Sequence, residues 1–273
     1  MQIYCRIFEM PQNQSNLGIK FAYPRRIDYT TDMKKILLFT FLIGAVAFAK
    51  AQSNYHDLLE LIVDEKYDRC LLKAMKYMDS DKTSKDALPY VYASMAYYRI
   101  YQSDDEDLKT KFEKPIKYTV KYLEKFRKKD KENEFVAEFE DYISEVRQTV
   151  MEEAERELSS EKYTRAKSHY KNLTDIDEQD PGAWLMLAYT YQLMRSTKDA
   201  RDSFEKTKEI INTSDCTALK DEQKDLLKRA IILTAEMLDE TGDRSAAKEW
   251  LEIGAPLFSE DKEYNVTYKM IVG

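Results

Sequence analysis

Apolar residues recur at steps of three and four along most of the chain, which is the spacing of one face of an α-helix. The longest such stretch runs from Phe135 to Leu158 and predicts a helix that begins near Lys131. Shorter stretches with the same spacing predict further helices at 58–62, 67–77, 92–96, 116–123, 163–173, 184–191, 200–204, 231–238 and 247–251. We therefore expect an all-α protein of about ten helices.

Two of these stretches are copies of one repeat with a fixed period. The apolar residues Val150, Ala154, Ala166 and Tyr170 recur, each at the same distance along the chain, as Trp184, Ala188, Ala200 and Phe204. A fixed period of this length, which is the separation of residues 150 and 184, is typical of proteins built from helix pairs. Each pair is too small to bury its own apolar face, so neighbouring pairs stack and share one core. An irregular helical bundle is the alternative, and the period favours the repeat.

The second copy of this repeat resembles the tetratricopeptide repeat (TPR), whose pattern is W-x2-L-G-x2-Y followed by A-x3-F. The matching residues here are Trp184, Leu187, Ala188, Tyr191, Ala200 and Phe204. Asp180 and Pro181 precede them, where an aspartate caps a helix and a proline suits its first turn. The resemblance implies a right-handed α-solenoid of about five TPR-like helix hairpins over residues 52–261.

Two connections depart from the TPR spacing. In the fifth pair, which turns at Gly242, the second helix comes later in the chain than the period predicts. We expect Asp215 to Leu227 to form an insertion or a helix extension with an exposed polar turn. In the second pair the two halves lie further apart than in the TPR family, and the excess falls at the acidic loop Ser103 to Asp107, whose charge favours the start of the following helix.

The C-terminal residues 262–273 form a separate tail. Large apolar residues alternate at period two from Tyr264 to Val272, which predicts a strand. An irregular segment packed over the final helix pair is the favoured role. The alternatives are a strand added to a partner's sheet and a segment that occupies the binding groove.

Residues 33–51 have the three parts of a secretory signal peptide, which are a pair of lysines, a short apolar run from Ile36 to Phe48 and an A-x-A motif ending at Ala51. A membrane span needs about 20 apolar residues, so we expect cleavage after Ala51, with an uncleaved anchor as the alternative. Residues 1–32 then form a non-native leader, with translation starting at Met33. The protein is expected to be exported, to the periplasm or the exterior of a bacterial cell.

Charge and cysteine content limit the classes of partner and the kinds of membrane attachment that we expect. Residues 52–273 carry 36 Lys and Arg against 47 Asp and Glu. The resulting net charge of −11 disfavours nucleic acid, whose binding relies on clustered cations. No cysteine stands directly after the cleavage site, so we expect neither a lipid anchor nor a membrane span after cleavage. Cys70 fits a thiol packed within a helix pair, and its pairing with Cys216 is undecided.

In TPR proteins the first helix of each pair lines a concave groove. The groove positions here hold Tyr90, Tyr97, Ile100, Tyr101, Met151, Glu155, Leu185, Tyr189, Gln192, Leu193, Glu236 and Asp239. Such a groove is aromatic and apolar with acid at one end, which suits an extended or helical peptide with apolar side chains and a basic end. A chaperone carboxylate clamp is not expected, because its lysine and asparagine places hold residues such as Met151 and Glu155. Internal packing of several of these side chains is the alternative.

The sequence offers no pattern for catalysis, a cofactor or a metal. His56 and His169 are the only histidines and stand far from each other and from the cysteines, so solvated helix positions are expected rather than zinc ligands. Asp175-Ile176-Asp177 begins like a calcium loop but lacks its glycine and its glutamate. No phosphate loop or nucleophile elbow occurs, and we expect a non-enzyme.

Two functions remain open. The first is an exported scaffold or adaptor that holds a protein or peptide of an envelope assembly in the groove. The second is a receptor for a carbohydrate or another small ligand, in which Tyr97, Tyr101 and Trp184 stack on sugar rings. Because Trp184 occupies a packing position of its repeat, the scaffold is preferred.

Overall fold

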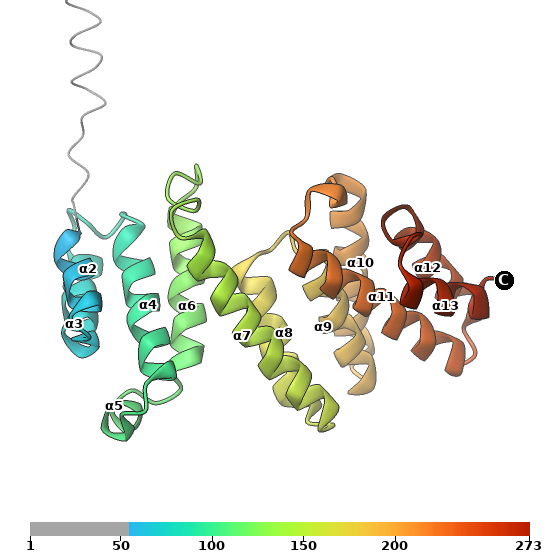
Figure 1. The fold of residues 1–273 in the computed structure, drawn as a ribbon, viewed down its shortest axis with the longest axis horizontal. Helices are drawn as coiled ribbons and strands as arrows, with labels where there is room; N and C mark the ends of the chain where they lie inside the picture. Colours follow the sequence, from blue (N-terminus) through green and yellow to red (C-terminus); the bar gives the residue numbers. More distant parts are fainter. Residues whose placement is uncertain (1–54) are drawn as a thin grey trace, which may run out of the picture. The chain divides into compact units, whose positions relative to one another are not determined.

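The computed structural model of the protein describes residues 55–273, and every regular element in that range is a helix (Figure 1). This confirms the predicted all-α class. The helices are α2 (His56–Val63), α3 (Tyr67–Asp79), α4 (Leu88–Gln102), α5 (Glu106–Lys111), α6 (Pro115–Lys129), α7 (Glu140–Ser159), α8 (Tyr163–Ile176), α9 (Pro181–Leu193), α10 (Thr197–Thr213), the short 3-10 helix η1 (Cys216–Ala218), α11 (Asp221–Glu240), α12 (Arg244–Phe258) and α13 (Lys262–Ile271). The predicted leader at 1–32 and signal peptide at 33–51 lie outside the described residues.

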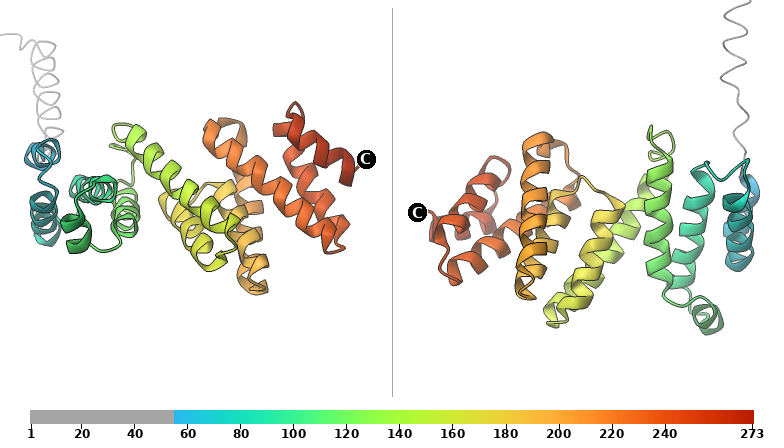
Figure 2. Two further views of the ribbon diagram at one scale, coloured as in Figure 1. Left: turned by 60° about the horizontal axis from the view of Figure 1, so that its bottom comes forward. Right: turned by 180° about the vertical axis from the view of Figure 1, so that it is seen from behind.

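Successive helices pack as pairs, and each pair packs on the next. The pairs are α2 with α3, α4 with α6, α7 with α8, α9 with α10, and α11 with α12. Contacts of α3 with α4, of α6 and α9 with α8, and of α9 with α11 join neighbouring pairs, so the helices follow one another in chain order (Figures 1 and 2). The short α5 lies in the connection within the second pair, where the sequence has its extra residues and Asp105 caps the helix.

Small buried residues mark the places where paired helices approach most closely. Ala154, Ala166, Ala188 and Ala200 have no exposed surface, so their small side chains let the backbones come together without leaving a cavity. These are the four alanines of the sequence repeat. The repeat therefore records packing positions within the helix pairs.

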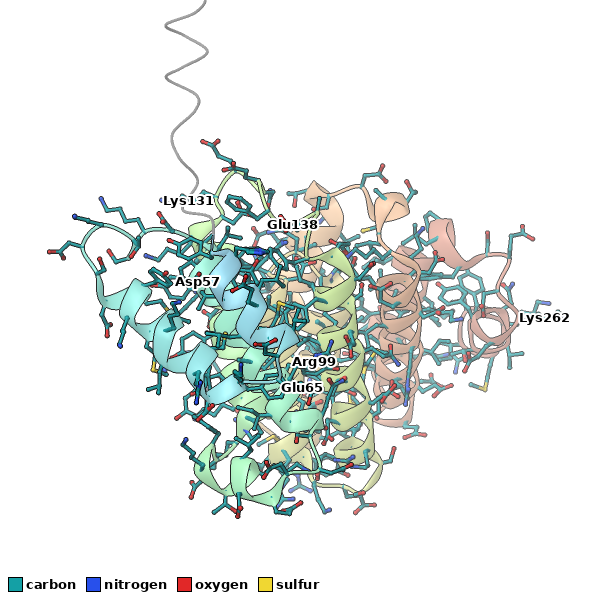
Figure 3. The ribbon with its side chains drawn as sticks, turned by 60° about the vertical axis from the view of Figure 1, so that its left-hand side comes forward. Asp57, Glu65, Arg99, Lys131, Glu138 and Lys262 are labelled. Carbon is teal, nitrogen blue, oxygen red and sulfur yellow. The ribbon has the colours of Figure 1, made fainter. Side chains whose placement is uncertain are left out.

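In four of the five pairs, the same tight turn joins the first helix to the second. Its central residue has a positive φ, and these residues are Glu65, Glu161, Arg195 and Gly242, with φ of 58°, 59°, 59° and 89°. The N–H of this residue donates to the carbonyl three residues earlier, and the next N–H donates to the carbonyl five residues before it. This is a Schellman motif, which satisfies the last carbonyls of the first helix. Figure 3 labels Glu65, the first of these turn residues, at the end of α2.

The predicted start of the long helix is wrong, and Asp130 explains why. α7 begins at Glu140 and not near Lys131, because the Asp130 carboxylate accepts the backbone N–H groups of residues 134–136 at 2.8 to 3.1 Å. These bonds hold the segment in turns, along which Figure 3 labels Lys131 and Glu138. A buried carboxylate that satisfies three N–H groups competes with helix formation.

The end of the stretch Asp215 to Leu227 is a helix extension, one of the two predicted forms, because α11 begins at Asp221. The expected exposure is wrong at Leu226 and Leu227, which are buried. A Cβ atom added to Gly182 on α9 would lie 2.7 Å from the backbone nitrogen of Leu227. The glycine therefore permits the start of α11 to touch α9.

The predicted C-terminal strand is wrong, because the tail forms helix α13. Asp261 caps it by accepting the N–H of Tyr264 at 3.0 Å. Tyr264, Thr267 and Ile271 are buried where α13 packs on α11 and α12, and the Tyr264 hydroxyl donates to the Leu251 carbonyl. The tail covers the final helix pair (Figure 2), but it does so as a helix.

A buried ion pair ties α7 to the start of α9. The Arg147 guanidinium contacts the Asp180 carboxylate, and the two side chains are 5% and 0% exposed. Asp180 also accepts the N–H of Ala183 at 3.1 Å, which confirms its predicted capping role, and Pro181 stands in the first turn. One carboxylate thus caps α9 and anchors it to the preceding pair.

Cys70 and Cys216 are both free and buried, so they do not pair. The Cys70 thiol lies between the carbonyls of Leu58 and Tyr92, at 3.7 and 3.9 Å, as expected for a packed thiol. Among residues 55–273, no helix combines the length and apolar character needed to cross a bilayer.

Candidate functional site

Four of the predicted groove residues are buried in the core, which corrects their assignment to an open surface. Tyr90, Tyr97, Ile100 and Leu185 are each at most 7% exposed. They lie on α4 and α9, which are apolar on nearly all sides and are covered by their neighbours. Tyr97 stacks on two tyrosine rings of α6 at centroid distances of 5.1 and 5.7 Å.

The other eight predicted residues are half-buried and reach the surface: Tyr101, Met151, Glu155, Tyr189, Gln192, Leu193, Glu236 and Asp239. Two of them, Tyr101 and Asp239, are bound to charged side chains of neighbouring helices. The Tyr101 hydroxyl donates to Glu153 at 2.9 Å, and burial together with this carboxylate raises the pKa of Tyr101 to about 12. Asp239 pairs with Arg244 at 3.0 Å across the turn between α11 and α12.

An ion pair between Glu155 on α7 and Arg229 on α11 joins the first helices of two pairs that are not neighbours in the chain. Both side chains remain partly exposed, at 29% and 44%. α9 belongs to the pair between them and packs on α11, and in Figure 1 it lies deeper than α7 and α11. We treat the partly exposed residues of α7, α9 and α11 around this ion pair as one surface.

Tyr189 on α9 lies within this surface. Burial raises the pKa of its hydroxyl, Tyr163, Glu240 and Glu236 raise it further, and Arg229 opposes them. The hydroxyl is therefore in reach of charges from α11 as well as of a tyrosine from α8. The structure thus brings Tyr189 and Glu236, two predicted residues, together with Arg229, which the sequence did not single out.

The surface continues into a hollow of about 760 Å³ between α11 and α13, which we call the α11–α13 hollow. Its lining is formed by Asp225, Lys228, Arg229, Ile232, Leu233, Glu236, Glu263, Val266 and Thr267. Thr267 donates to Glu236 at 3.1 Å and so fixes α13 beside α11. Of this lining, only Glu236 was among the predicted groove residues. Glu263, Val266 and Thr267 were not predicted because the tail was expected to form a strand.

The hollow combines an apolar floor with an acidic rim. Ile232 and Leu233 form the floor beside Val266, which is 69% exposed. The ammonium of Lys228 is held by Asp261 at 2.8 Å, whereas Asp225 lies further from it, at 3.6 Å, and its side chain is 78% exposed. The cations are thus neutralised within the fold while carboxylates face solvent, which favours a ligand with apolar and basic groups.

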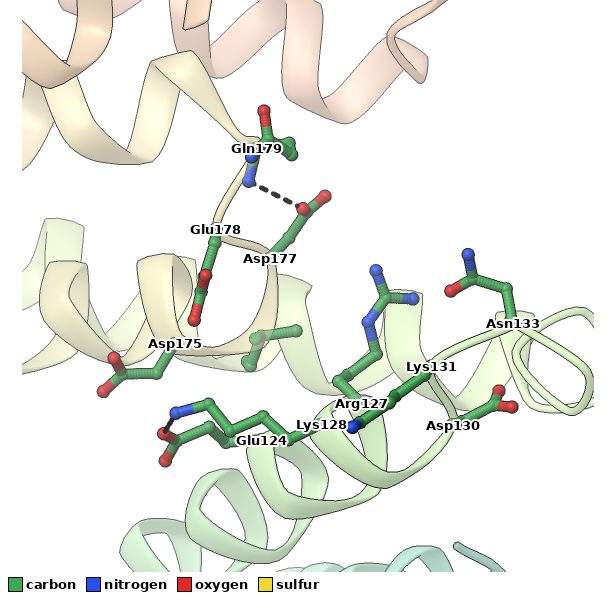
Figure 4. Close-up of a pocket in the computed structure, with 11 residues that line it drawn as sticks. Glu124, Arg127, Lys128, Asp130, Lys131, Asn133, Asp175, Asp177, Glu178 and Gln179 are labelled. Carbon is green, nitrogen blue, oxygen red and sulfur yellow. Dashed lines mark hydrogen bonds and ion pairs between the residues drawn. The ribbon is translucent and has the colours of Figure 1, made fainter.

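A second hollow of about 240 Å³ lies between the end of α6 and the connection from α8 to α9 (Figure 4). Several of its charged groups already have partners. Glu124 pairs with Lys128 at 2.6 Å, and Asp177 accepts from Gln223 at 3.1 Å and from the N–H of Gln179 at 3.0 Å. These contacts make it a polar seam between helix pairs rather than a preferred ligand site.

The histidines are separate from both hollows. His56 is exposed beside Glu60 at 3.4 Å. His169 is half-buried rather than solvated, and burial lowers its pKa. Within residues 55–273, no group of three His, Cys, Asp or Glu side chains is placed to hold a metal ion.

A comparison with models of known protein families found no match to this chain, and a comparison with curated proteins found none either.

Proposed function

We propose that the helix pairs form a right-handed TPR-like solenoid that acts as a non-catalytic scaffold, and that the α11–α13 hollow binds a peptide segment of a protein partner. The successive packing of the pairs and their common turn support the repeat architecture. The α11–α13 hollow supports the binding role, because it is larger than the hollow beside α6 and combines an apolar floor with solvent-exposed carboxylates.

The ligand that fits is a short extended or helical segment with one or two apolar side chains and a lysine or arginine beside them. Apolar side chains fill the floor at Ile232, Leu233 and Val266. The basic group meets the exposed carboxylate of Asp225 or Glu263. Arg229, which is paired with Glu155, also lines the hollow.

A carbohydrate receptor has less support. Of its three proposed stacking residues, Tyr97 is buried, Tyr101 is bonded to Glu153, and the indole N–H of Trp184 donates to the Glu178 carbonyl at 3.1 Å. None of these rings lines either of the two hollows described above for residues 55–273.

The test selects binders for residues 52–273 from a random peptide library and measures their affinity by fluorescence anisotropy. Val266→Asp places a charge on the apolar floor, and Leu72→Asp on α3 is the matched control because its residue is similarly exposed, at 61% against 69%. We expect V266D to weaken binding at least about tenfold, since burying one aliphatic side chain contributes about 1.5 to 3 kcal/mol. The control should bind as the wild type does.

Equal loss in both variants, or no selected peptide at all, would contradict a peptide site in the hollow. A glycan array tests the receptor on the same protein, and specific glycan capture without peptide binding would reverse the preference. We also propose that the protein is exported after cleavage at Ala51, on the signal pattern at 33–51. Retention of residues before Gln52 in the native protein, seen by N-terminal sequencing, would contradict that proposal.

A further inference from the structure

Charge is distributed unevenly along the chain. Residues 109–131, which include α6, hold ten Lys and Arg against three Asp and Glu. Residues 132–273 hold 19 Lys and Arg against 32 Asp and Glu. An acidic protein therefore carries one strongly basic segment, and such asymmetry marks a surface for an oppositely charged partner.

The cations of α6 form a stripe along its exposed side. Lys117, Lys121, Lys125 and Lys129 follow one another at intervals of four residues, and all four are exposed. Residues four apart lie on one face of a helix, about 6 Å apart along its axis. Within the described part of the chain, no carboxylate forms an ion pair with the first three of these lysines, and the only acidic residue of α6, Glu124, is paired with Lys128.

Tyrosine rings support the stripe from beneath. The ammonium of Lys121 lies 5.6 Å from the ring of Tyr118, and that of Lys125 lies 5.7 Å from the ring of Tyr122. Both rings are half-buried and stack on the core residue Tyr97. Cation–π contacts of this kind hold an ammonium in place without neutralising it, so the stripe is ordered and still charged.

Helix stability does not explain the stripe. Cations in the last turn interact favourably with the helix dipole, but Lys117 lies in the first turn, where no acidic residue is present and a positive charge is unfavourable. Like charges four residues apart also repel along a helix. The arrangement opposes the stability of α6, which points to a role in binding.

We infer that this stripe of α6 binds an acidic peptide segment of a protein partner, at a site separate from the α11–α13 hollow. Side chains on one face of an extended strand repeat at about 6.6 Å, and those four residues apart on a helix at about 6 Å. Carboxylates at alternate positions of a strand, or at every fourth position of a helix, therefore match the lysine spacing. The inference does not depend on the proposed function of the hollow.

The extent of the stripe favours a short peptide over a long polyanion. From Lys117 to Lys129 the helix rises by about 18 Å. Each strand of duplex DNA carries a charge roughly every 3.4 Å along the helix axis, about twice as densely as the stripe. A longer polyanion would also extend beyond α6 onto a chain whose remaining described residues carry a net negative charge.

The test measures binding of a fluorescent peptide with glutamate at alternate positions to residues 52–273, with the glutamine version as its control. The variant Lys117→Gln/Lys121→Gln/Lys125→Gln removes three of the four stripe lysines and keeps Lys129, whose ammonium donates to the Ser84 carbonyl at 2.6 Å. Its matched control, Lys76→Gln/Lys198→Gln/Lys269→Gln, changes three exposed lysines on other helices by the same net charge. We expect the stripe variant to lose at least about tenfold in affinity and to show a smaller salt dependence, while the control stays within about twofold.

Circular dichroism monitors the fold, and the stripe variant should melt no lower than wild type because it relieves like-charge repulsion. Equal losses in both triple variants would show a net-charge effect and overturn the inference. Binding of a single-stranded oligonucleotide, an acidic polysaccharide or anionic vesicles in preference to the glutamate peptide would overturn the ligand class. Self-association of the wild type that the stripe variant abolishes would overturn it too, by assigning the surface to a second copy.

Discussion

The variant Gly182→Ala tests the close contact between α9 and α11, the helix that lines the α11–α13 hollow. Gly182 is buried in the first turn of α9. A Cβ atom there would lie 2.7 Å from the nitrogen of Leu227, 3.1 Å from its Cα and 3.1 Å from the carbonyl carbon of Leu226. All three are backbone atoms, so no side-chain rotation can make room for the methyl group.

The expected cost follows from this geometry. An ordinary contact to a Cβ atom is at least 3.4 Å, so the two helices must separate or one of them must shift. Adding a methyl group to a well-packed site costs roughly 1 to 3 kcal/mol, while alanine regains at most about 1 kcal/mol in helix propensity. We expect a net loss of about 1 to 2 kcal/mol, which lowers the Tm of a domain of this size by about 2 to 8 °C.

Urea unfolding followed by circular dichroism and by tryptophan fluorescence measures the effect, and Trp184 reports directly on α9. The midpoint should fall with little change in slope. Gly242→Ala is the comparison, because nothing lies within 4 Å of its added Cβ and only the φ of 89° is unfavourable, at about 1 to 2 kcal/mol. A Gly182→Ala protein as stable as the wild type would refute the close approach of α9 and α11.

Asp180→Asn keeps the cap of α9 but leaves the Arg147 guanidinium buried without a counter-charge, so urea unfolding should show a loss of about 3 to 5 kcal/mol. Arg147→Met in the double variant should recover most of it, and a loss below about 1 kcal/mol in D180N would contradict the pairing. Glu161→Gly removes a non-glycine residue at positive φ and should raise stability by about 0.5 to 1 kcal/mol; a lower melting temperature would contradict this. The Lys228 ammonium and the cap of α13 lower the pKa of Asp261, so its stabilising effect is present above the ordinary aspartate value and is lost as pH falls through the lower folded value. The protection factors of the α13 amides against hydrogen exchange should therefore fall below about pH 4 in the wild type, and an unchanged acid response in Asp261→Asn would contradict the assignment.

The period of the repeat could be read from the sequence, whereas the geometry of the turns could not. Glu161 and Arg195 occupy equivalent turns that are one period apart. Sequence rules search for glycine at such a position, because other residues are strained at positive φ, and only Gly242 gives that signal. At the other turns, packing of the two helices imposes the conformation on residues that do not favour it.

The four predicted groove residues that are buried all lie on α4 and α9, the two helices that are apolar on nearly all sides. The position rules assume that the first helix of each pair keeps one face open. α4 and α9 are covered on nearly all sides, so Tyr97 and Leu185 became core residues. Arg229 was missed because its partner Glu155 lies on a helix of another pair, and such a contact depends on how the pairs stack. Periodicity within one helix carries no information on that stacking.

The C-terminal tail shows why a local pattern alone can select the wrong element. Tyr264, Val266 and Tyr268 alternate at period two, but Tyr264, Thr267 and Ile271 also lie at helical spacing within the same segment. The structure buries the helical set and leaves Val266 exposed.

Two features decide between the patterns, namely the Asp261 cap at the start of α13 and the neighbouring surface of α11 and α12. Because that surface is formed by helices, it offers no sheet edge for a strand, and a helix satisfies its own backbone hydrogen bonds. The exposed Val266 is part of the α11–α13 hollow. The helical conformation of the tail therefore also provides the apolar contact proposed for the ligand.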